Sequence, residues 1–302
     1  MTIEIRQLRY AVATADAQSF SRAATTLRVK QSTLSRRVLL MEEQLGVKLF
    51  DRSTRGAEPT EAGKKVLESA RRIVTDVDNL IVTAREMTYG QLGKVSIGFS
   101  SPLTGGNLHA VISEYLNRFP EAQFDGVEAE PERLFNALQL RTLDAAIVPA
   151  DISDKGIKRA SLWSERVMII LKDDHPLAEA EPIYWTDLKR EVFVVPREGN
   201  GAILGNLLAA RLTDQRLRPN IIIQDTSHDT IVNAVRMGRF NAIATDAMLG
   251  VPWPGVVFRE VHDVSSKAHL DFSIFWREDN ENPALKHFFK LIKERHPSFE
   301  LG

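Results

Sequence analysis

Residues 30 to 39 read KQSTLSRRVL, a polar opening with three hydroxyl side chains and two adjacent arginines. Apolar residues recur within and after it at spacings of four and three: Leu34, Val38, Met41 and Leu45. This spacing predicts a helix from about 31 to 44 with one buried face, ended by Gly46. The polar side chains of the first turns contribute little to a core. They predict a surface that meets hydrogen-bonding groups and negative charge together.

Two shorter helices are expected before this one. Residues Ile5 to Ala17 carry apolar side chains at helical spacing, and Ser19 offers an N-cap oxygen for FSRAATTL, residues 20 to 27. Two helices joined by a tight turn, the second led by polar residues, describe a helix-turn-helix. In such a motif only the start of the second helix reaches base edges, where Gln can pair with adenine and Arg with guanine.

A β-wing is predicted after the third helix. Leu49 to Arg52 reads as a short strand, STRG as a turn, and Ala57 to Thr60 as the returning strand. Arg52 and Arg55 would then contact the DNA backbone, which adds affinity without reading sequence.

Charge is distributed unevenly along the chain. Residues 1 to 72 contain 14 Lys and Arg against 8 Asp and Glu, whereas the remaining residues contain 25 against 32. The overall net charge of −1 therefore hides a basic head on an acidic body. This distribution favours a nucleic-acid-binding module joined to a second module of another kind.

The string from Arg6 to Gly63, RQLRYAVATADAQSFSRAATTLRVKQSTLSRRVLLMEEQLGVKLFDRSTRGAEPTEAG, resembles the N-terminal module of LysR-type transcriptional regulators. The resemblance implies an all-α winged helix-turn-helix over residues 1–60. It also implies a set of DNA-binding residues: Lys30, Gln31, Ser32, Thr33, Ser35, Arg36, Arg52 and Arg55. Lys30 departs from the family, which usually has a capping serine there. The helix start is then either looser or gains a phosphate contact from Lys30.

A long linker helix is expected over residues 60–90, with Thr60 as its N-cap and GQLGK after it. Its apolar residues form a heptad seam: Val66, Ala70, Ile73, Val77, Leu80, Ala84 and Met87. Such a seam predicts a helix pair, hence a dimer. The pair would set the distance between two recognition helices and favour a two-fold-related operator.

From Lys94 onward, predicted strands such as KVSIGF, LDAAIVP, RVMIILK and VFVVP alternate with helical segments, of which the last is expected at 283–295. This alternation predicts a mostly parallel sheet in an α/β domain. ALQLRTLDAAIV and AVRMGRFNAIAT resemble each other, as if the body held two similar halves. The arrangement resembles periplasmic binding proteins, the fold of the LysR effector domain. That resemblance implies a domain over 93–302, with subdomain I at about 93–161 and 268–302 and subdomain II at about 162–267.

Ligands bind beyond the carboxyl ends of strands in open α/β sheets. That rule selects nine candidate effector-binding residues: Ser100, Ser101, Thr104, Pro149, Gly199, Asn200, Thr226, Ser227 and Thr245. Hydroxyls and helix N-terminal amides facing one crevice would suit a small carboxylate or phenolic effector. Glu128 and Glu130 end a strand nearby and weigh against a simple dicarboxylate.

Enzyme interpretations find weaker support. GFSSP resembles a nucleophile elbow with Ser100, but Pro102 replaces the second glycine and the histidines lack a pattern. GNGAILG, residues 199–205, departs from the dinucleotide fingerprint because its third glycine comes one residue late. No His or acidic cluster has metal-ligand spacing. We therefore expect no enzyme, no cofactor and no metal. A solute-binding module without a DNA role, or an α/β hydrolase, stays the alternative.

Compartment and partners complete the sequence-based expectations. Cysteine is absent, and neither a signal peptide nor a membrane span is evident, so we expect a cytoplasmic protein without membrane partners. The family resemblance implies double-stranded DNA, a small-molecule effector and RNA polymerase as partners. It further implies a homodimer, or a homotetramer as the working form.

Overall fold

A computed structural model describes residues 3–53, 56–89, 93–149, 154–197, 199–213, 218–263 and 267–300. The chain divides into two compact units, Met1–Gly90 and Gln91–Gly302, and each unit is described by itself.

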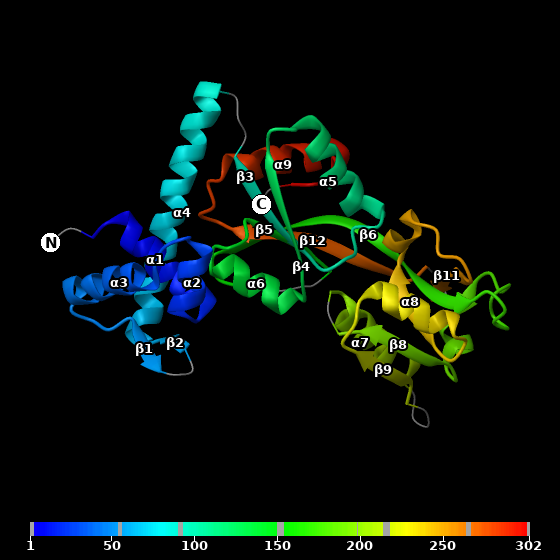
Figure 1. Cartoon of the computed structure of the whole chain (residues 1–302). Helices are drawn as coiled ribbons and strands as arrows, with labels where there is room; N and C mark the ends of the chain where they lie inside the picture. The colour runs from blue at the N-terminus through cyan, green and yellow to red at the C-terminus, as the bar shows by residue number, and fades with distance from the viewer. Residues whose placement is uncertain are drawn as a thin grey trace. The chain divides into compact units, whose positions relative to one another are not determined.

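The first unit opens with three helices and a two-stranded wing (Figure 1). These are α1 (Ile5–Ala17), α2 (Phe20–Thr26), α3 (Gln31–Leu45), β1 (Phe50–Ser53) and β2 (Gly56–Pro59). The apolar face of α3 is buried, because Leu34, Val38 and Met41 are 0% exposed. Gly46 ends α3 in the left-handed backbone region, which favours glycine.

Helix α4 (Glu61–Tyr89) completes this unit. Its first half packs on the three-helix core through Leu67 and Ala70, each 1% exposed. Ion pairs from Arg9 to Asp78 and from Arg71 to Asp16 tie α4 to the rest of the unit. Farther along, Ile73, Leu80 and Ile81 are 43%, 68% and 42% exposed. The helix therefore changes from a buried to an exposed apolar stripe along its length.

The second unit contains, in its described residues, one sheet of ten strands with helices on both faces. The first half consists of β3 (Lys94–Phe99), β4 (Gln123–Glu128), β5 (Ala145–Val148), β12 (His269–Arg277), α5 (Gly106–Arg118), α6 (Pro131–Gln139) and α9 (Pro283–Arg295). Figure 1 shows α5 and α9 on one side of these strands and α6 on the other. Two hydrophobic clusters, one on each side, hold the three helices to the sheet.

The second half repeats this plan. It consists of β8 (Val192–Pro196), β9 (Asn220–Gln224), β10 (Asn241–Thr245), α7 (Gly201–Leu212), α8 (His228–Arg236), β11 (Val256–His262), β7 (Ile183–Tyr184) and two 3₁₀ turns, Trp185–Leu188 and Asp246–Gly250. The strands β8, β9 and β10 run parallel, in the order β10-β8-β9. Helices α7 and α8 belong to two separate hydrophobic clusters of this half.

Strand β6 (Ile157–Lys172) joins the halves. It pairs antiparallel with β12 as far as Arg166 and with β10 from Val167 onward. The sequence pattern predicted only RVMIILK, residues 166–172, as a strand. Residues 157–165 were not predicted as a strand, because the alternation of buried and exposed side chains breaks at Leu162 and Trp163, which are both buried. Both halves are therefore built on one continuous backbone segment.

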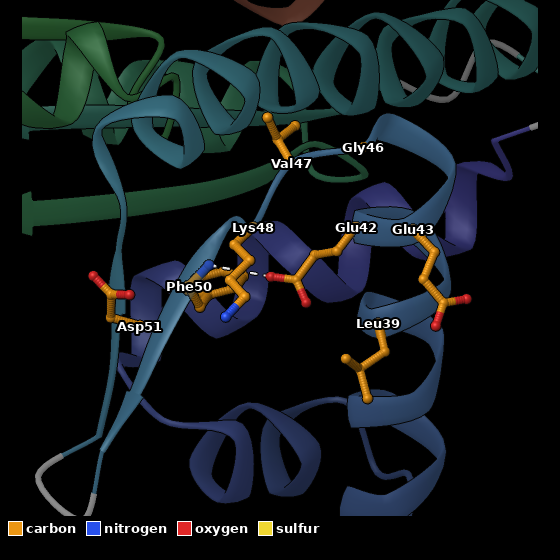
Figure 2. A pocket seen from close by; sticks show the side chains of 8 residues that line it. All are labelled: Leu39, Glu42, Glu43, Gly46, Val47, Lys48, Phe50 and Asp51. Carbon is orange, nitrogen blue, oxygen red and sulfur yellow. Dashed lines mark hydrogen bonds between the residues drawn. The ribbon is translucent and has the colours of Figure 1, made fainter.

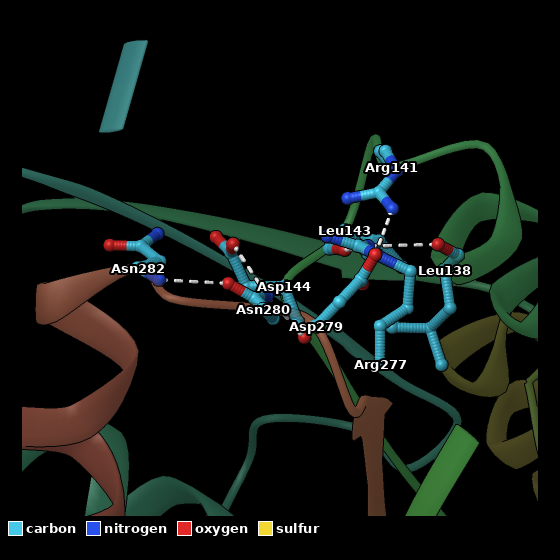
Figure 3. A network of polar contacts seen from close by, with 8 residues as sticks. All are labelled: Leu138, Arg141, Leu143, Asp144, Arg277, Asp279, Asn280 and Asn282. Atoms are coloured by element: carbon cyan, nitrogen blue, oxygen red, sulfur yellow. Dashed lines mark hydrogen bonds and ion pairs between the residues drawn. The ribbon is translucent and has the colours of Figure 1, made fainter. Parts of the chain in front are cut away.

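A buried arginine fixes the end of β12. Arg277 donates to the carbonyls of Leu138 and Leu143, at 2.9 and 3.1 Å. Figure 3 draws this network. Asp279 pairs with both Arg277 and Arg141. Burial lowers the pKa of the Arg277 guanidinium, and the positive charge of Arg141 lowers it further. The network holds the α6–β5 loop against β12.

Candidate functional site

The first turn of α3 presents an unpartnered polar surface. Gln31, Ser32 and Arg36 are exposed, and their side chains make no hydrogen bond or ion pair with any described residue. Thr33 is exposed beside them, whereas Ser35 is half-buried. Arg37, by contrast, bonds to Glu4 at 3.3 Å. Within the polar opening, Gln31, Ser32 and Arg36 thus have no partner among the described residues, whereas Arg37 has one.

Lys30 occupies the N-cap of α3 with an extended backbone and gives no side-chain capping bond. The backbone carbonyl of Lys30 accepts from Thr33 and Leu34, which starts the helix. Its exposed side chain therefore leaves the first amides of α3 uncovered. Such amides and a nearby ammonium group suit a phosphate oxygen.

The wing is linked to α3 by Glu42. Its carboxylate accepts from the backbone amide of Leu49 at 2.7 Å and from that of Phe50 at 3.2 Å. Figure 2 draws the bond to Phe50. Beside this bond lies a hollow of about 640 Å³ lined by Leu39, Glu42, Glu43, Gly46, Val47, Lys48, Phe50 and Asp51. Of the predicted backbone contacts, Arg52 lies on β1 with its side chain outside the described part, and Arg55 lies outside the described residues. Their DNA contacts stay predictions.

The residues of the predicted heptad seam of α4 differ in burial. Ala70 is 1% exposed against the core of the same chain, where α1 and β2 contact α4, so the seam interpretation was wrong for this residue. Val66 is half-buried, and its place in the seam stays a prediction. Ile73, Leu80 and Ala84 are exposed and Val77 is half-buried. The side chain of Met87 lies outside the described part.

In the second unit a cavity of about 710 Å³ opens at the carboxyl ends of β3, β4, β8 and β9. It is lined by Pro102, Leu103, Thr104, Glu128, Pro196, Asp225, Thr226, Ser227, His228 and Asp229. Thr104, Thr226 and Ser227 are sequence-predicted effector residues. The hydroxyl of Ser227 also caps α8, and that of Thr104 donates to the Ala247 carbonyl at 2.9 Å.

Other predicted effector residues are buried and do not line this cavity. Ser100, Ser101, Asn200 and Thr245 are 0–1% exposed. The amide of Asn200 lies 3.5 Å from the Ser101 hydroxyl and its carbonyl 3.3 Å from His228 Nε2. Gly199 is buried where a Cβ would meet the Ser100 carbonyl at 2.9 Å. Pro149 is half-buried and is not part of the cavity lining.

Glu165 is a site residue that the sequence did not reveal. It is 1% exposed on β6, and its Oε1 accepts from the Trp163 indole at 3.2 Å. Burial raises the pKa of the Glu165 carboxyl, while nearby Thr245 and Trp163 act in the opposite direction. Neither Glu165 Oε2 nor Thr245 Oγ1 has a hydrogen bond of ordinary geometry with described residues. Only a predicted strand that covered all of β6, with side chains alternating between its two faces, would have indicated from the sequence that Glu165 is buried.

One histidine and three carboxylates are the ionisable side chains of the described cavity lining. Burial lowers the pKa of His228, against the opposing influence of Asp229, so its imidazole favours the neutral form. Glu128, Asp225 and Asp229 all belong to the lining, which contains no Lys or Arg among the described residues. The cavity is therefore acidic at neutral pH.

The described residues show no arrangement of catalytic groups that would support the enzyme alternatives. Ser100 Oγ has no hydrogen-bond partner in the described chain, so no base is positioned to activate it. In the same part of the chain, no group of three or more His, Cys, Asp or Glu residues could hold a metal ion. None of the described helices is long and apolar enough to cross a membrane.

Two family models match the chain. Residues 5–64 match the bacterial regulatory helix-turn-helix protein, lysR family, and residues 90–297 match the LysR substrate binding domain.

The regulator ClcR of Pseudomonas putida is 27% identical over 97% of this chain and 99% of that protein. Among solved structures, a full-length single-residue variant of OxyR from Pseudomonas aeruginosa covers 100% of this chain and 99% of its own, at 19% identity and a TM-score of 0.77. Full-length CbnR complexed with its target DNA covers 96% and 99%, at 22% identity and a TM-score of 0.68.

These matches confirm the fold class expected from the sequence: an N-terminal winged helix-turn-helix followed by an α/β effector domain. They cover the polar face of α3 and the acidic cavity alike. The chain belongs to the LysR family of DNA-binding transcriptional regulators with an effector-binding domain.

Proposed function

We propose that this chain changes transcription of its target genes by placing the first turn of α3 in the major groove. The observation that carries the proposal is the set of exposed, unpartnered side chains Gln31, Ser32 and Arg36 at the start of a helix whose other face is buried. Such side chains lose no internal bond when they turn to base edges. Lys30, Arg52 and Arg55 would contact phosphates, and Thr33 and Ser35 complete the predicted surface.

We propose that two chains pair through the exposed part of α4. Ile73, Leu80 and Ile81 form an apolar stripe that stays 43%, 68% and 42% exposed in the first unit. Pairing would bury it and set two recognition helices at a fixed distance, which favours a two-fold-related operator. A tetramer and a contact with RNA polymerase are parts of the proposal that rest on the family alone.

The cavity at the strand ends is the proposed effector site. Thr104, Thr226 and Ser227 on its wall, and Ser101 and Asn200 behind it, offer hydrogen bonds from both halves. A small molecule bound there would change the contact between the halves and so bias the regulator between two states. Of the carboxylate and phenolic classes expected from the sequence, a carboxylate fits poorly, because the lining already holds three carboxylates.

The test of DNA reading uses the purified full chain and its own upstream region. Arg36→Ala should weaken binding to a duplex from that upstream region about 10- to 100-fold at fixed salt concentration, and it should relax the base preference at one position. Arg239→Ala, an exposed arginine of the second unit, is the matched control. Fluorescence anisotropy measures both. Unchanged affinity and base preference in Arg36→Ala would exclude the proposed role of α3.

A further inference from the structure

The hollow between the end of α3 and the start of the wing combines apolar and acidic side chains. Its described lining holds the carboxylates of Glu42, Glu43 and Asp51 against the ammonium group of Lys48. Figure 2 shows these side chains around the space between the helix and β1. Residues 1 to 72 as a whole carry 14 Lys and Arg against 8 Asp and Glu. The charge of the hollow is therefore opposite to that of the region around it.

The last turn of α3 places a carboxylate where a helix favours a cation. The carbonyl end of a helix carries partial negative charge, and the last turn of α3 contains no basic residue. Glu42 is engaged there by the amides of Leu49 and Phe50. The exposed side chain of Glu43 forms no hydrogen bond or ion pair with any described residue. A positive charge in the hollow would be stabilised by Glu43 and by the helix end together.

The wing adds negative charge from a different element. Asp51 on β1 lies directly opposite Glu58 on β2, and both side chains are exposed. Like charges in such a cross-strand pair are destabilising. Neither carboxylate pairs with a cation among the described residues. A cation brought to the wing side of the hollow would relieve this repulsion.

Apolar side chains distinguish this hollow from an ordinary solvated acidic surface. Leu39 is 43% exposed and Val47 36% exposed, and both belong to the lining. Exposed apolar side chains rimmed by polar groups are typical of protein interfaces. A small cation would satisfy the carboxylates but leave Leu39 and Val47 in water. The hollow therefore fits a protein segment that combines an apolar side chain with positive charge.

The hollow lies on the same face of α3 as the proposed base contacts. Ser32, Arg36, Leu39 and Glu43 are all exposed and follow one another at spacings of four, three and four, so they lie along one face. At 1.5 Å per residue, Glu43 is about 10 Å along the helix from Arg36. Its carboxylate would repel phosphates. This end of the face therefore suits a protein that lies beside the DNA.

We infer that the hollow docks a second protein, bound to neighbouring DNA, through a segment in which one apolar side chain is flanked by lysine or arginine. The inference rests on the proposed placement of α3 in the major groove. A protein on neighbouring DNA presents lysine and arginine to the phosphates, so its surface near the DNA has the required charge. Leu39 and Val47 cover the apolar side chain, and Glu43 and Asp51 pair with the flanking cations.

The first test uses the full chain without DNA and three matched peptides. One peptide has a leucine flanked by lysines, the second has glutamates in place of the lysines, and the third has serine in place of the leucine. Because residues 73–302 are acidic and attract any basic peptide, binding is followed at the methyl NMR signals of Leu39 and Val47. The leucine–lysine peptide should saturate these signals with a Kd of about 1 mM or tighter, and the other two should bind at least about tenfold more weakly.

Variants separate the two parts of the surface. Leu39→Ser should weaken the leucine–lysine peptide at least about tenfold. The Glu43→Gln, Asp51→Asn double variant should do the same, and it should remove most of the salt dependence of binding. Its binding is followed at the same methyl signals. Glu68→Gln, at an exposed carboxylate of α4 in the same unit, is the matched control and should change neither.

The second test measures operator binding and transcription together. Leu39→Ser should keep the operator affinity of the wild type in fluorescence anisotropy and lose most of its effect on transcription from the chain's own upstream region. Arg36→Ala should lose both. The proposed DNA contact fails when Arg36→Ala leaves operator binding unchanged, whereas the docking inference is read from Leu39→Ser, so the two failures are distinguishable.

Four outcomes would overturn the inference. The first is equal binding of the glutamate peptide, or no saturable shift with the lysine peptide. The second is unchanged peptide binding in both Leu39→Ser and the double variant. The third is a loss of operator affinity in Leu39→Ser, which would assign this side chain to the DNA contact. The fourth is a lower sedimentation coefficient of Leu39→Ser without any partner, which would assign the hollow to a second copy of the chain.

Discussion

The first two turns of α3 and the buried region near the carboxyl ends of β3 and β10 hold similar residue types in opposite settings. On α3, Gln31, Ser32 and Arg36 are neighbours in the sequence, exposed and without partners among the described residues. In the second unit, Ser101 lies in the loop after β3, Glu165 on β6 and Thr245 at the end of β10, so the three are far apart in the sequence, and all are buried. A surface made by consecutive residues depends on local helix geometry, whereas a buried site depends on how the whole sheet is assembled. Substitutions at the two places should therefore differ in what they cost.

The largest effect is expected beneath the α3 surface. Leu34→Ala should lower the free energy of unfolding of the first unit by about 2–5 kcal/mol, because Leu34 is fully buried and its loss leaves a cavity. Chemical denaturation followed by circular dichroism measures it. Leu39→Ala on the same helix, at a side chain that is 43% exposed, is the control and should stay within about 0.5 kcal/mol. Equal losses in both variants would contradict the separation of a buried and an exposed face.

The next effect concerns α4. Leu80→Asp should weaken chain association at least about tenfold, because it places a charge in the apolar stripe that pairing would bury. Sedimentation equilibrium measures the dissociation constant. Arg72→Asp, which puts the same charge on an exposed position of α4 outside the seam, should leave association nearly unchanged. A fully associated Leu80→Asp chain would remove the helix-pair proposal.

A smaller effect should follow pH in the second unit. Since burial raises the pKa of Glu165 in the folded chain, the folded state favours the protonated carboxyl, and stability is lost as pH rises through that value. Glu165→Gln mimics the protonated form. It should match the wild type below about pH 4 and exceed it by roughly 1 kcal/mol at higher pH.

Thermal melts of both chains across pH measure this difference. The lowered pKa of His228 destabilises both chains as pH falls, so the comparison at each pH removes its contribution. A constant difference between the two chains at all pH values would show that Glu165 does not ionise within the range.

The smallest effect is expected at Lys30. Lys30→Ser supplies the side-chain oxygen that the N-cap lacks and should stabilise the first unit by about 0.5–1 kcal/mol. Denaturant melts measure it, with Lys48→Ser as the control at an exposed lysine outside any helix. The same variant should lose DNA affinity if Lys30 contacts phosphate, which separates the two roles left open by the sequence. Failure to gain stability would mean that the helix start is already satisfied.

The sequence predicted elements whose boundary signals are local. The helix expected at 283–295 is α9, Pro283–Arg295, where Asn282 caps the Ala284 amide, proline takes the first turn and Arg295 ends the helix. The wing and the linker helix also lie where turn and heptad patterns indicated. The family resemblance supplied the two-half architecture, which the matching family models confirm.

The features that escaped prediction depend on long-range pairing. The first part of β6 has a broken alternation that only its pairing with β12 resolves, including a register shift between Asp271 and Ser273. Glu165 became visible as a candidate only when this part of β6 was in place. Ala70 was assigned to a partner helix, because a heptad pattern does not say whether the covering residues belong to the same chain.

Glu42 has a consequence for how this regulator could acquire a new operator. The Glu42 carboxylate, near the far end of α3, accepts from the amides of Leu49 and Phe50, so it links the proposed base-reading helix to the proposed phosphate contacts of the wing. If α3 reads bases as proposed, exchanging side chains on its first turns would alter which bases are preferred and leave the Glu42 link unchanged. A change in the distance between the proposed groove contact and the proposed backbone contact would instead alter the Glu42 link. We therefore expect Glu42 and the wing to be replaced together.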